Sequence, residues 1–363
     1  MRARLRGCVL GGGVGDEAGA PVEFLTLEQI HARFGPGGIR RYAAAFGRPV
    51  AITDDTQMTM FTVEGLIRAS VRARSKGICG TAGVVLHAYW RWLVTQGETP
   101  IERHPTVNDS GQPEWMDGWL AHEQGLHVRR APGTSCLSAL RSGKYGTPEE
   151  PINNSKGCGA VMRGAPVGFV PWSAGEQMFA LGCEIGALTH GHPTGYAAAG
   201  ALAVMIDRLR SGETLEQAAE LAIRCLRQNE IFTETRRALE GALRLAAGGS
   251  PSAAKVESLG GGWVAEEALA IAVYAALVSP TFEEAVVLAV NHGGDSDSTG
   301  AICGNLIGAR DGVFAILPEF LATLEARQIL TQLADDFARE LTEPPTDACG
   351  LGEASSDWFH RYP

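Results

Sequence analysis

The segment TGYAAAGALAVMIDRL, residues 194–209, is the clearest indication of the fold class of this chain. Its alanines favour helix, and their small side chains let neighbouring helices approach closely. A Thr, or the Pro-Thr pair at 193–194, caps its start. The segment therefore predicts a helix that packs among other helices.

Similar patterns lie on both sides of this segment, separated by short loops. Apolar residues recur at helical spacing, and they predict helices at 53–71, 215–228, 233–247, 265–277, 282–291, 298–310 and 320–341. Strand candidates such as 165–170 are too few to build a sheet. We therefore expect a single all-α domain over residues 1–345, with helices around a central cleft and a C-terminal tail at 346–363.

Residues 104–157 form the exception, because they have little periodicity and are rich in Pro, Gly, Asn and Asp. A long irregular stretch in a compact domain is often a functional loop. Trp115, Trp119, Leu126 and Cys136 provide anchoring side chains. We expect an ordered, loop-rich region that lines the cleft.

The composition excludes several classes of function. The chain has 363 residues, is 45% hydrophobic and carries a formal net charge of −10. This balance argues against non-specific binding to nucleic acid or to an anionic membrane, and no run of about 20 apolar residues predicts a membrane span. The eight scattered cysteines show no zinc-finger spacing. We expect reduced thiols in a cytoplasmic monomer.

Two acidic clusters are the main candidates for chemistry. The first is Thr53-Asp54-Asp55-Thr56, at the start of a predicted helix, where one acid could simply cap the helix. The second is Asp295-Ser296-Asp297-Ser298, which follows two glycines. In a loop geometry its two carboxylates can turn toward one point.

The ligand chemistry of both clusters favours a hard cation. Oxygen donors from Asp, Ser and Thr suit Mg²⁺ rather than Zn²⁺. Four acids packed together without a cation would repel one another and lose solvation. If the clusters meet in space, they predict a two-metal site with ions roughly 3.5–4 Å apart. Glu23, between Val22 and Phe24, adds a partly buried carboxylate or a solvated charge at a helix end.

Six motifs, taken together and in their order along the chain, resemble those of the ADP-ribosylglycohydrolase family, which includes ADP-ribosylarginine hydrolases. The matching segments are GDEAGAPVEF (15–24), TDDT (53–56), SKGCGAVMRGAPVGF (155–169), LTHGHPTGY (188–196), LGGGWVAEEAL (259–269) and GGDSDSTG (293–300). One departure is Glu17-Ala18, where many relatives have Ala-Leu. Ser298 is similar to the arginine-specific members, where other members carry Thr.

The resemblance implies an all-α fold and two Mg²⁺ ions, for which Mn²⁺ can substitute. It implies that the metal ligands are Thr53, Asp54, Asp55, Asp295, Asp297 and Ser298. Glu23 matches a mobile glutamate beside the metals in some members. The catalytic set is then Glu23, Asp54, Asp55 and Asp297, and either Glu23 or Asp55 would manage protons.

The remaining motifs are assigned to the substrate. The glycine-containing turn can bring main-chain N–H groups close to a pyrophosphate, with Lys156 adding charge; its residues are Ser155, Lys156, Gly157, Cys158 and Gly159. The resemblance puts His190 near the phosphates or the ribose. It also puts Trp263 against the adenine, and an indole face suits stacking on a base. Each of these residues also has an ordinary structural explanation.

The expected reaction is hydrolysis of the bond at ribose C1″, which releases ADP-ribose from modified arginine side chains. ADP-ribosyl-serine or another ADP-ribosylated substrate is an alternative. The chain could also be a non-catalytic binder of ADP-ribosylated proteins or a nucleotide phosphohydrolase. It could be an immunity protein that neutralises an ADP-ribosyltransferase, by hydrolysis or by direct binding. The intact set of ligands argues against a non-catalytic role.

Overall fold

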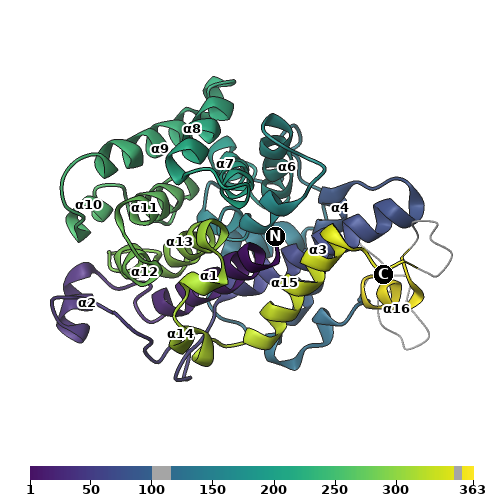
Figure 1. Cartoon of the computed structure of the whole chain (residues 1–363), viewed down its shortest axis with the longest axis horizontal. Coiled ribbons are helices and arrows are strands. Elements are labelled where there is room, and N and C mark those ends of the chain that lie inside the picture. Colours follow the sequence, from purple (N-terminus) through teal and green to yellow (C-terminus); the bar gives the residue numbers. More distant parts are fainter. Residues whose placement is uncertain (100–115, 347–353) are drawn as a thin grey trace.

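The computed structural model describes residues 1–99, 116–346 and 354–363, and these residues form helices and connecting loops with no named β-strand (Figure 1). The predicted all-α class is therefore confirmed. Six short 3₁₀ helices occur at Leu120–His122, Gln124–Leu126, Cys158–Ala160, Ala165–Phe169, Glu230–Phe232 and Val313–Ala315. The α-helices are α1 (Arg2–Gly19), α2 (Leu27–Phe34), α3 (Asp54–Lys76), α4 (Thr81–Thr95), α5 (Thr134–Arg141), α6 (Glu176–Ala187), α7 (Pro193–Arg210), α8 (Leu215–Leu226), α9 (Thr233–Ala246), α10 (Ala253–Glu257), α11 (Ala265–Val278), α12 (Phe282–Val290), α13 (Ser296–Asp311), α14 (Pro318–Thr323), α15 (Arg327–Thr342) and α16 (Ser356–Arg361).

Two buried helices from opposite ends of the chain, α1 and α13, touch backbone to backbone. Glycines four residues apart lie on one helix face, and each helix presents such a row to the other. A Cβ on Gly15 would lie 1.9 Å from the carbonyl oxygen of Gly300, so no side chain fits between the helices. Two further glycine pairs continue this glycine ladder, Gly11 with Gly304 and Gly7 with Gly308. The ladder fixes the end of α1 beside the start of α13.

The helix predicted at 194–209 is α7, and most of its side chains are buried. It packs closely on α6, since a Cβ on Gly182 would lie 2.7 Å from the Cα of Gly200. The predicted helices at 215–228, 233–247, 265–277 and 282–291 are also present, with ends that differ by at most two residues. Helix α3 is buried over most of its length and runs through the centre of the domain (Figure 1).

Two predictions about local structure are wrong. The helix predicted at 320–341 is divided into α14 and α15, because Ala326 adopts a left-handed conformation with φ of 56° and interrupts the helix. The strand candidate at 165–170 is a 3₁₀ helix, in which Pro166 occupies one of the first two positions. Proline has no N–H to donate to a sheet, which disfavours a strand there.

The loop-rich region predicted at 104–157 is described from residue 116 onward, and 104–115 lie outside the described residues. This part contains one α-helix, α5, as well as two 3₁₀ turns, so it is more regular than its sequence predicts. The main chain before α5 is held by Arg130, whose Nη2 donates to Glu325 Oε1 over 2.9 Å.

Residues 354–363, within the predicted tail, pack on α15. Trp358 Nε1 donates to Glu340 Oε2 over 2.8 Å, and the Tyr362 hydroxyl donates to Asp336 Oδ2 over 2.5 Å. The described cysteines are free, and Cys183, Cys225 and Cys303 are buried as expected; Cys349 lies outside the described residues. Among the described helices, none is both long and apolar enough to cross a membrane.

Candidate metal and substrate site

A cavity of about 370 Å³ lies where the starts of α3, α5 and α13 converge. Both acidic clusters reach it, although about 240 residues separate them in sequence. Its walls carry Glu23, Asp54, Asp55, Asp295 and Asp297. Of the other residues predicted for the site, Gly157, Cys158, Gly159, His190, Trp263 and Ser298 also line it. The structure therefore brings most of the predicted residues together.

The first cluster is held at the start of α3 by Thr53 and by an acid from α1. Thr53 is the N-cap, and its hydroxyl accepts the Asp55 N–H over 3.3 Å. The buried Asp16 carboxylate accepts the N–H and the hydroxyl of Thr53, and also those of Thr56. These bonds leave one lone pair of the Thr53 hydroxyl for another partner. Asp16 thus positions the first cluster.

The second cluster differs from the expected loop geometry, because α13 begins at Ser296 and includes Asp297 in its first turn. Asp295 is the N-cap, and its Oδ1 accepts the Ser298 N–H over 3.3 Å. The Asp295 N–H donates to the Gly261 carbonyl oxygen over 2.8 Å. A Cβ on Gly294 would lie 1.9 Å from that oxygen, so only glycine fits before the cap. Helix geometry, rather than a loop, aims this cluster into the cavity.

Glu23 lies in the turn that follows α1, and its Oε2 is buried without a hydrogen-bond partner. Oxygen atoms of Glu23, Asp295 and Asp297 lie within 4.8 Å of one another. Burial, followed by the charges of Asp297 and Asp295, raises the pKa of Glu23 to about 10. This group of three acids is the most compact arrangement of candidate metal ligands found among the described residues.

The pKa values of other acids in the cavity are raised by the same two causes, burial and neighbouring negative charge. Burial, and then the charge of Asp297, raise the pKa values of Asp54 and Asp55 well above the usual range. Burial also raises the pKa of Asp297 itself, followed by the charge of Asp295. None of these carboxylates forms an ion pair with a described Lys, Arg or His side chain.

These observations fit a hard cation. Asp55 Oδ2 and Glu23 Oε2 are buried without partners, and an unsatisfied buried oxygen is costly. The donors are oxygen atoms, which Mg²⁺ and similar ions prefer. The residues that line the cavity and could hold such ions are Asp54, Asp55, Asp295, Asp297 and Ser298, with Glu23 beside them. Thr53, the other predicted ligand, is not part of the lining and is buried at the N-cap of α3, next to Asp54.

The turn at 155–159 crosses the cavity wall and is fixed to the start of α11. The Cys158 N–H donates to the Trp263 carbonyl oxygen over 3.2 Å, and the Ala265 N–H donates to that of Lys156 over 2.9 Å. The Gly157 N–H is bound by the Ser155 hydroxyl over 3.3 Å. Two of the N–H groups expected to face a pyrophosphate therefore already have protein partners.

Lys156 is directed away from the cavity. Its Nζ lies 2.6 Å from Glu266 Oε1 and 2.8 Å from Glu234 Oε2, and it is not among the residues that line the cavity. Ser155 also lies outside the lining, and its hydroxyl is hydrogen-bonded to that of Ser135 over 2.7 Å. Ser135 itself lines the cavity, so Ser155 stands behind this wall.

His190 is buried in the cavity wall, and its Nδ1 is 2.8 Å from the Thr189 hydroxyl. Burial, followed by the charge of Arg163, lowers the pKa of His190 to about 3, so the ring is neutral near pH 7. A Cβ on Gly159 would lie 2.9 Å from His190 Cε1 and 2.8 Å from Cys136 Sγ. Gly159 is thus needed because the ring and the turn pack so closely.

Trp263 stands at the mouth of the cavity with 43% of its surface exposed. Its ring stacks on that of Phe24, with centroids 5.3 Å apart and planes inclined by 26°. Phe24 is 66% exposed and has a positive φ of 67°, which is rare for a bulky residue. The two rings together offer a flat apolar surface at the edge of the cavity.

Sequence reasoning missed several contributors to this site. Asp16 and Phe24 lie in the segment 15–24, which also contains the predicted site residue Glu23. Their closeness to Glu23 in the sequence is the signal that could have identified them. Arg163 is fully buried, and its Nη1 donates to the Gly159 carbonyl oxygen over 2.7 Å. The residues from Ala131 to Cys136 line the cavity and belong to the region 104–157 that is expected to line the cleft, although no motif singles them out individually.

Comparison with known proteins agrees with this architecture. The chain is 26% identical over 342 residues to the ADP-ribosyl-[dinitrogen reductase] glycohydrolase of Rhodospirillum rubrum, covering 89% of this chain and 91% of that protein. It is 23% identical to the ADP-ribosylarginine hydrolase Tri1 of Pseudomonas putida, covering 92% of this chain and 77% of that protein. A solved ADP-ribosylglycohydrolase-related protein complex has the same fold, with a TM-score of 0.66, 24% identity, and coverage of 93% of this chain and 98% of that chain.

The sequence model of a single family, described as ADP-ribosylglycohydrolase, matches residues 1–346. This range contains all the residues of the carboxylate-lined cavity and both helices of the glycine ladder. The chain therefore belongs to the ADP-ribosylglycohydrolase family.

Proposed function

We propose that this protein is a Mg²⁺-dependent hydrolase that removes ADP-ribose from modified arginine side chains by cleaving the bond at ribose C1″. The observation that carries the proposal is the cavity with five acids, none of which is paired with a described cationic side chain. The name of one relative, an ADP-ribosylarginine hydrolase, supports arginine as the modified residue. The name of another, an ADP-ribosyl-[dinitrogen reductase] glycohydrolase, supports removal of ADP-ribose from a protein.

Two Mg²⁺ ions would be held by Thr53, Asp54, Asp55, Asp295, Asp297 and Ser298. When bound, such ions polarise substrate oxygens and lower the pKa of water. Acids left unpaired by the protein are suited to this task, because the incoming charge relieves their repulsion. Mn²⁺ has similar ligand preferences and would be expected to replace Mg²⁺.

The protein's own groups would bind and orient the substrate. The first turn of α5 lines the cavity, and the N–H groups at a helix N-terminus favour an anion such as a pyrophosphate. Neutral His190 can donate or accept a hydrogen bond to a phosphate or a ribose hydroxyl. The Trp263 and Phe24 rings offer a stacking surface for the adenine.

Two acids are candidates for moving the proton, Glu23 and Asp55, because each has a buried oxygen without a partner. Their roles can be separated by substitution. Glu23→Gln should lower kcat and weaken Mg²⁺ binding only modestly, measured by titration calorimetry, because Glu23 lies beside the six proposed ligands and close to Asp295 and Asp297. Asp55→Asn should weaken Mg²⁺ binding itself.

The function is tested by incubating the protein with ADP-ribosyl-arginine and ADP-ribosyl-serine peptides, in Mg²⁺ and in chelator. We expect free ADP-ribose from the arginine peptide in Mg²⁺ only. Asp55→Ala should be inactive, and the matched control Asp311→Ala, which removes an acid at the far end of α13, should retain activity.

Other outcomes would point to other activities. Release of AMP or phosphate would indicate a phosphohydrolase, and release from the serine peptide alone would reject arginine. No turnover of either peptide, combined with a stable complex with an ADP-ribosyltransferase, would favour a binding role as an immunity protein.

A further inference from the structure

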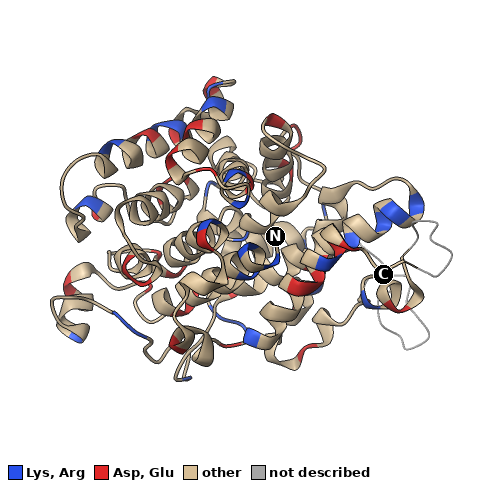
Figure 2. Cartoon of the chain, viewed as in Figure 1, with Lys and Arg blue, Asp and Glu red and all other residues tan. Residues whose placement is uncertain are grey.

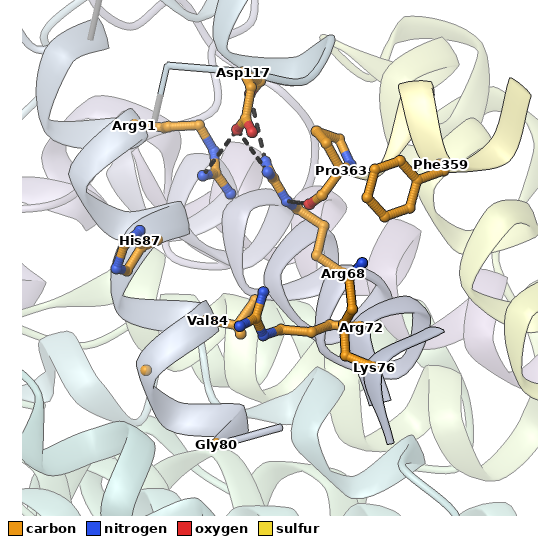
Figure 3. Close-up of a pocket in the computed structure, with 11 residues that line it drawn as sticks. Arg68, Arg72, Lys76, Gly80, Val84, His87, Arg91, Asp117, Phe359 and Pro363 are labelled. Carbon is orange, nitrogen blue, oxygen red and sulfur yellow. Dashed lines mark hydrogen bonds and ion pairs between the residues drawn. The ribbon is translucent and has the colours of Figure 1, made fainter. Parts of the chain in front are cut away.

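A second cavity, of about 400 Å³, opens between α3 and α4, and none of its lining residues belongs to the carboxylate-lined cavity. Figure 3 shows its walls. Residues four apart share one helix face, and here such residues carry basic side chains. Arg68, Arg72 and Lys76 come from α3, while His87 and Arg91 come from α4.

Two of these side chains are committed to the fold. Arg91 Nη2 lies 2.9 Å from Glu64 Oε2, and Arg68 Nη2 lies 2.5 Å from Asp117 Oδ1. Both arginines are buried. Their two positive charges are balanced by these two acids at the inner end of the cavity, so they add no net charge to it.

Arg72 and Lys76 are different, because both are exposed and the structure gives neither of them an ion pair with a described acid. Basic residues are concentrated along this end of α3 (Figure 2). They stand out in a chain whose formal net charge is −10. The mouth of the cavity therefore carries two positive charges that the described protein does not compensate.

The shape and the remaining walls limit what the cavity can bind. Its volume falls in the range of small-molecule sites, about 300–1,000 Å³. Phe359, which is 38% exposed, lines another wall and offers a flat apolar face. Cationic side chains recognise phosphate groups strongly, and an aromatic face accepts a planar ring.

We propose that this cavity is a second binding site, for a small phosphorylated ligand of the size of a nucleoside monophosphate. Arg72 and Lys76 hold the phosphate, and Phe359 contacts the planar ring. The site does not depend on the function proposed for the carboxylate-lined cavity, because the two cavities share no residue.

The test uses the full chain without divalent ions and measures the binding of AMP and of inorganic phosphate by calorimetry at low salt. The double variant Arg72→Gln/Lys76→Gln should bind both probes at least about tenfold more weakly, because it loses charge-assisted hydrogen bonds. The matched control is Arg237→Gln/Arg244→Gln, which removes two exposed arginines of α9 and should bind as the unchanged protein does. Melting temperatures should agree among all three proteins.

Phe359→Ala should weaken AMP binding several-fold and leave phosphate binding unchanged. The proposal is overturned if the unchanged protein binds neither probe at millimolar concentration, or if the control loses as much affinity as the double variant. It is also overturned if AMP binding survives in the double variant and disappears in Asp297→Ala, which would locate AMP in the other cavity. Binding of a polyglutamate peptide without binding of AMP would assign the surface to an acidic protein segment instead.

Discussion

Two regions of this molecule bury acidic side chains, and they do so in opposite ways. In the ion-pair cluster of Glu64, Arg68, Arg91 and Asp117, the buried Glu64 and the part-exposed Asp117 each lie against a guanidinium. In the carboxylate-lined cavity, the acids lie against one another, and two of their oxygens have no partner. Buried charge is tolerated when it is compensated. The protein provides the compensating charge in the first region, and we propose that a bound cation provides it in the second.

The largest effect is expected from Asp297→Ala, which removes an acid from the uncompensated region. Turnover of ADP-ribosyl-arginine peptide should fall by about a hundred- to a thousand-fold, the range seen when one electrostatic group of an active site is removed. In chelator, the melting temperature should stay the same or rise, because a source of repulsion is lost. A melting temperature that falls markedly in chelator would contradict the contrast between the two regions.

The opposite response is expected from Glu64→Ala, in the compensated region. Removing one partner of a buried pair typically costs about 3–5 kcal/mol. Urea unfolding should show a loss of that order. Asp335→Ala is the matched control, since its partner Arg6 is part-exposed and such pairs contribute about 1 kcal/mol or less. Similar losses in both variants would mean that burial does not determine how much an ion pair contributes to the free energy of unfolding.

Glu17 represents a third arrangement, a buried acid that is kept protonated. Burial raises its pKa from 4.5 to about 8, and its Oε1 accepts the Glu325 N–H over 3.1 Å. Between these two pH values the unfolded chain is ionised and the folded one is not, so stability falls as pH rises toward 8 and then levels off.

Glu17→Gln removes this titration and can still accept the same hydrogen bond. At pH 8 it should be more stable than the unchanged protein by on the order of 3 kcal/mol, and at pH 4 the two should be similar. Urea unfolding at both pH values measures the difference. If the gain is equal at the two pH values, ionisation of Glu17 is not its cause.

The smallest effect is expected at the edge of the cavity, where no charge is involved. Trp263→Ala should weaken substrate binding by about tenfold, because one stacking contact with a base is worth about 1–3 kcal/mol. Mg²⁺ affinity should be unchanged. Trp172→Ala is the matched control, because that tryptophan is 42% exposed and does not line the cavity. Unaltered substrate affinity in Trp263→Ala would reject the stacking role.

The sequence predicts local structure well where that structure depends on residues that are close together along the chain. The helix α7 and the cap-and-acid pattern at the start of α3 are local features, and the sequence predicts them nearly correctly. The role of Lys156 is not predicted correctly, because its partners Glu234 and Glu266 are 78 and 110 residues away. No local pattern shows that a lysine beside a glycine turn will be held elsewhere.

Helix α1 is a stronger example of structure that depends on residues far away in the sequence. It contains a run of glycines, Gly11 to Gly13, which disfavours an isolated helix. Only the matching glycines of α13 make that helix favourable, through contact between the two backbones. The repeat of glycine every fourth residue in both segments was the available signal, and it becomes meaningful only when the two segments are compared.

The glycine ladder also sets the order in which the site can form during synthesis. Gly7 is made about 300 residues before its partner Gly308. At a translation rate of about 5–20 residues per second, α1 waits tens of seconds for α13. Until then Asp16 and the acids of α3 have no second cluster opposite them. The cavity is therefore completed late, and the proposed metal ligands come together only then.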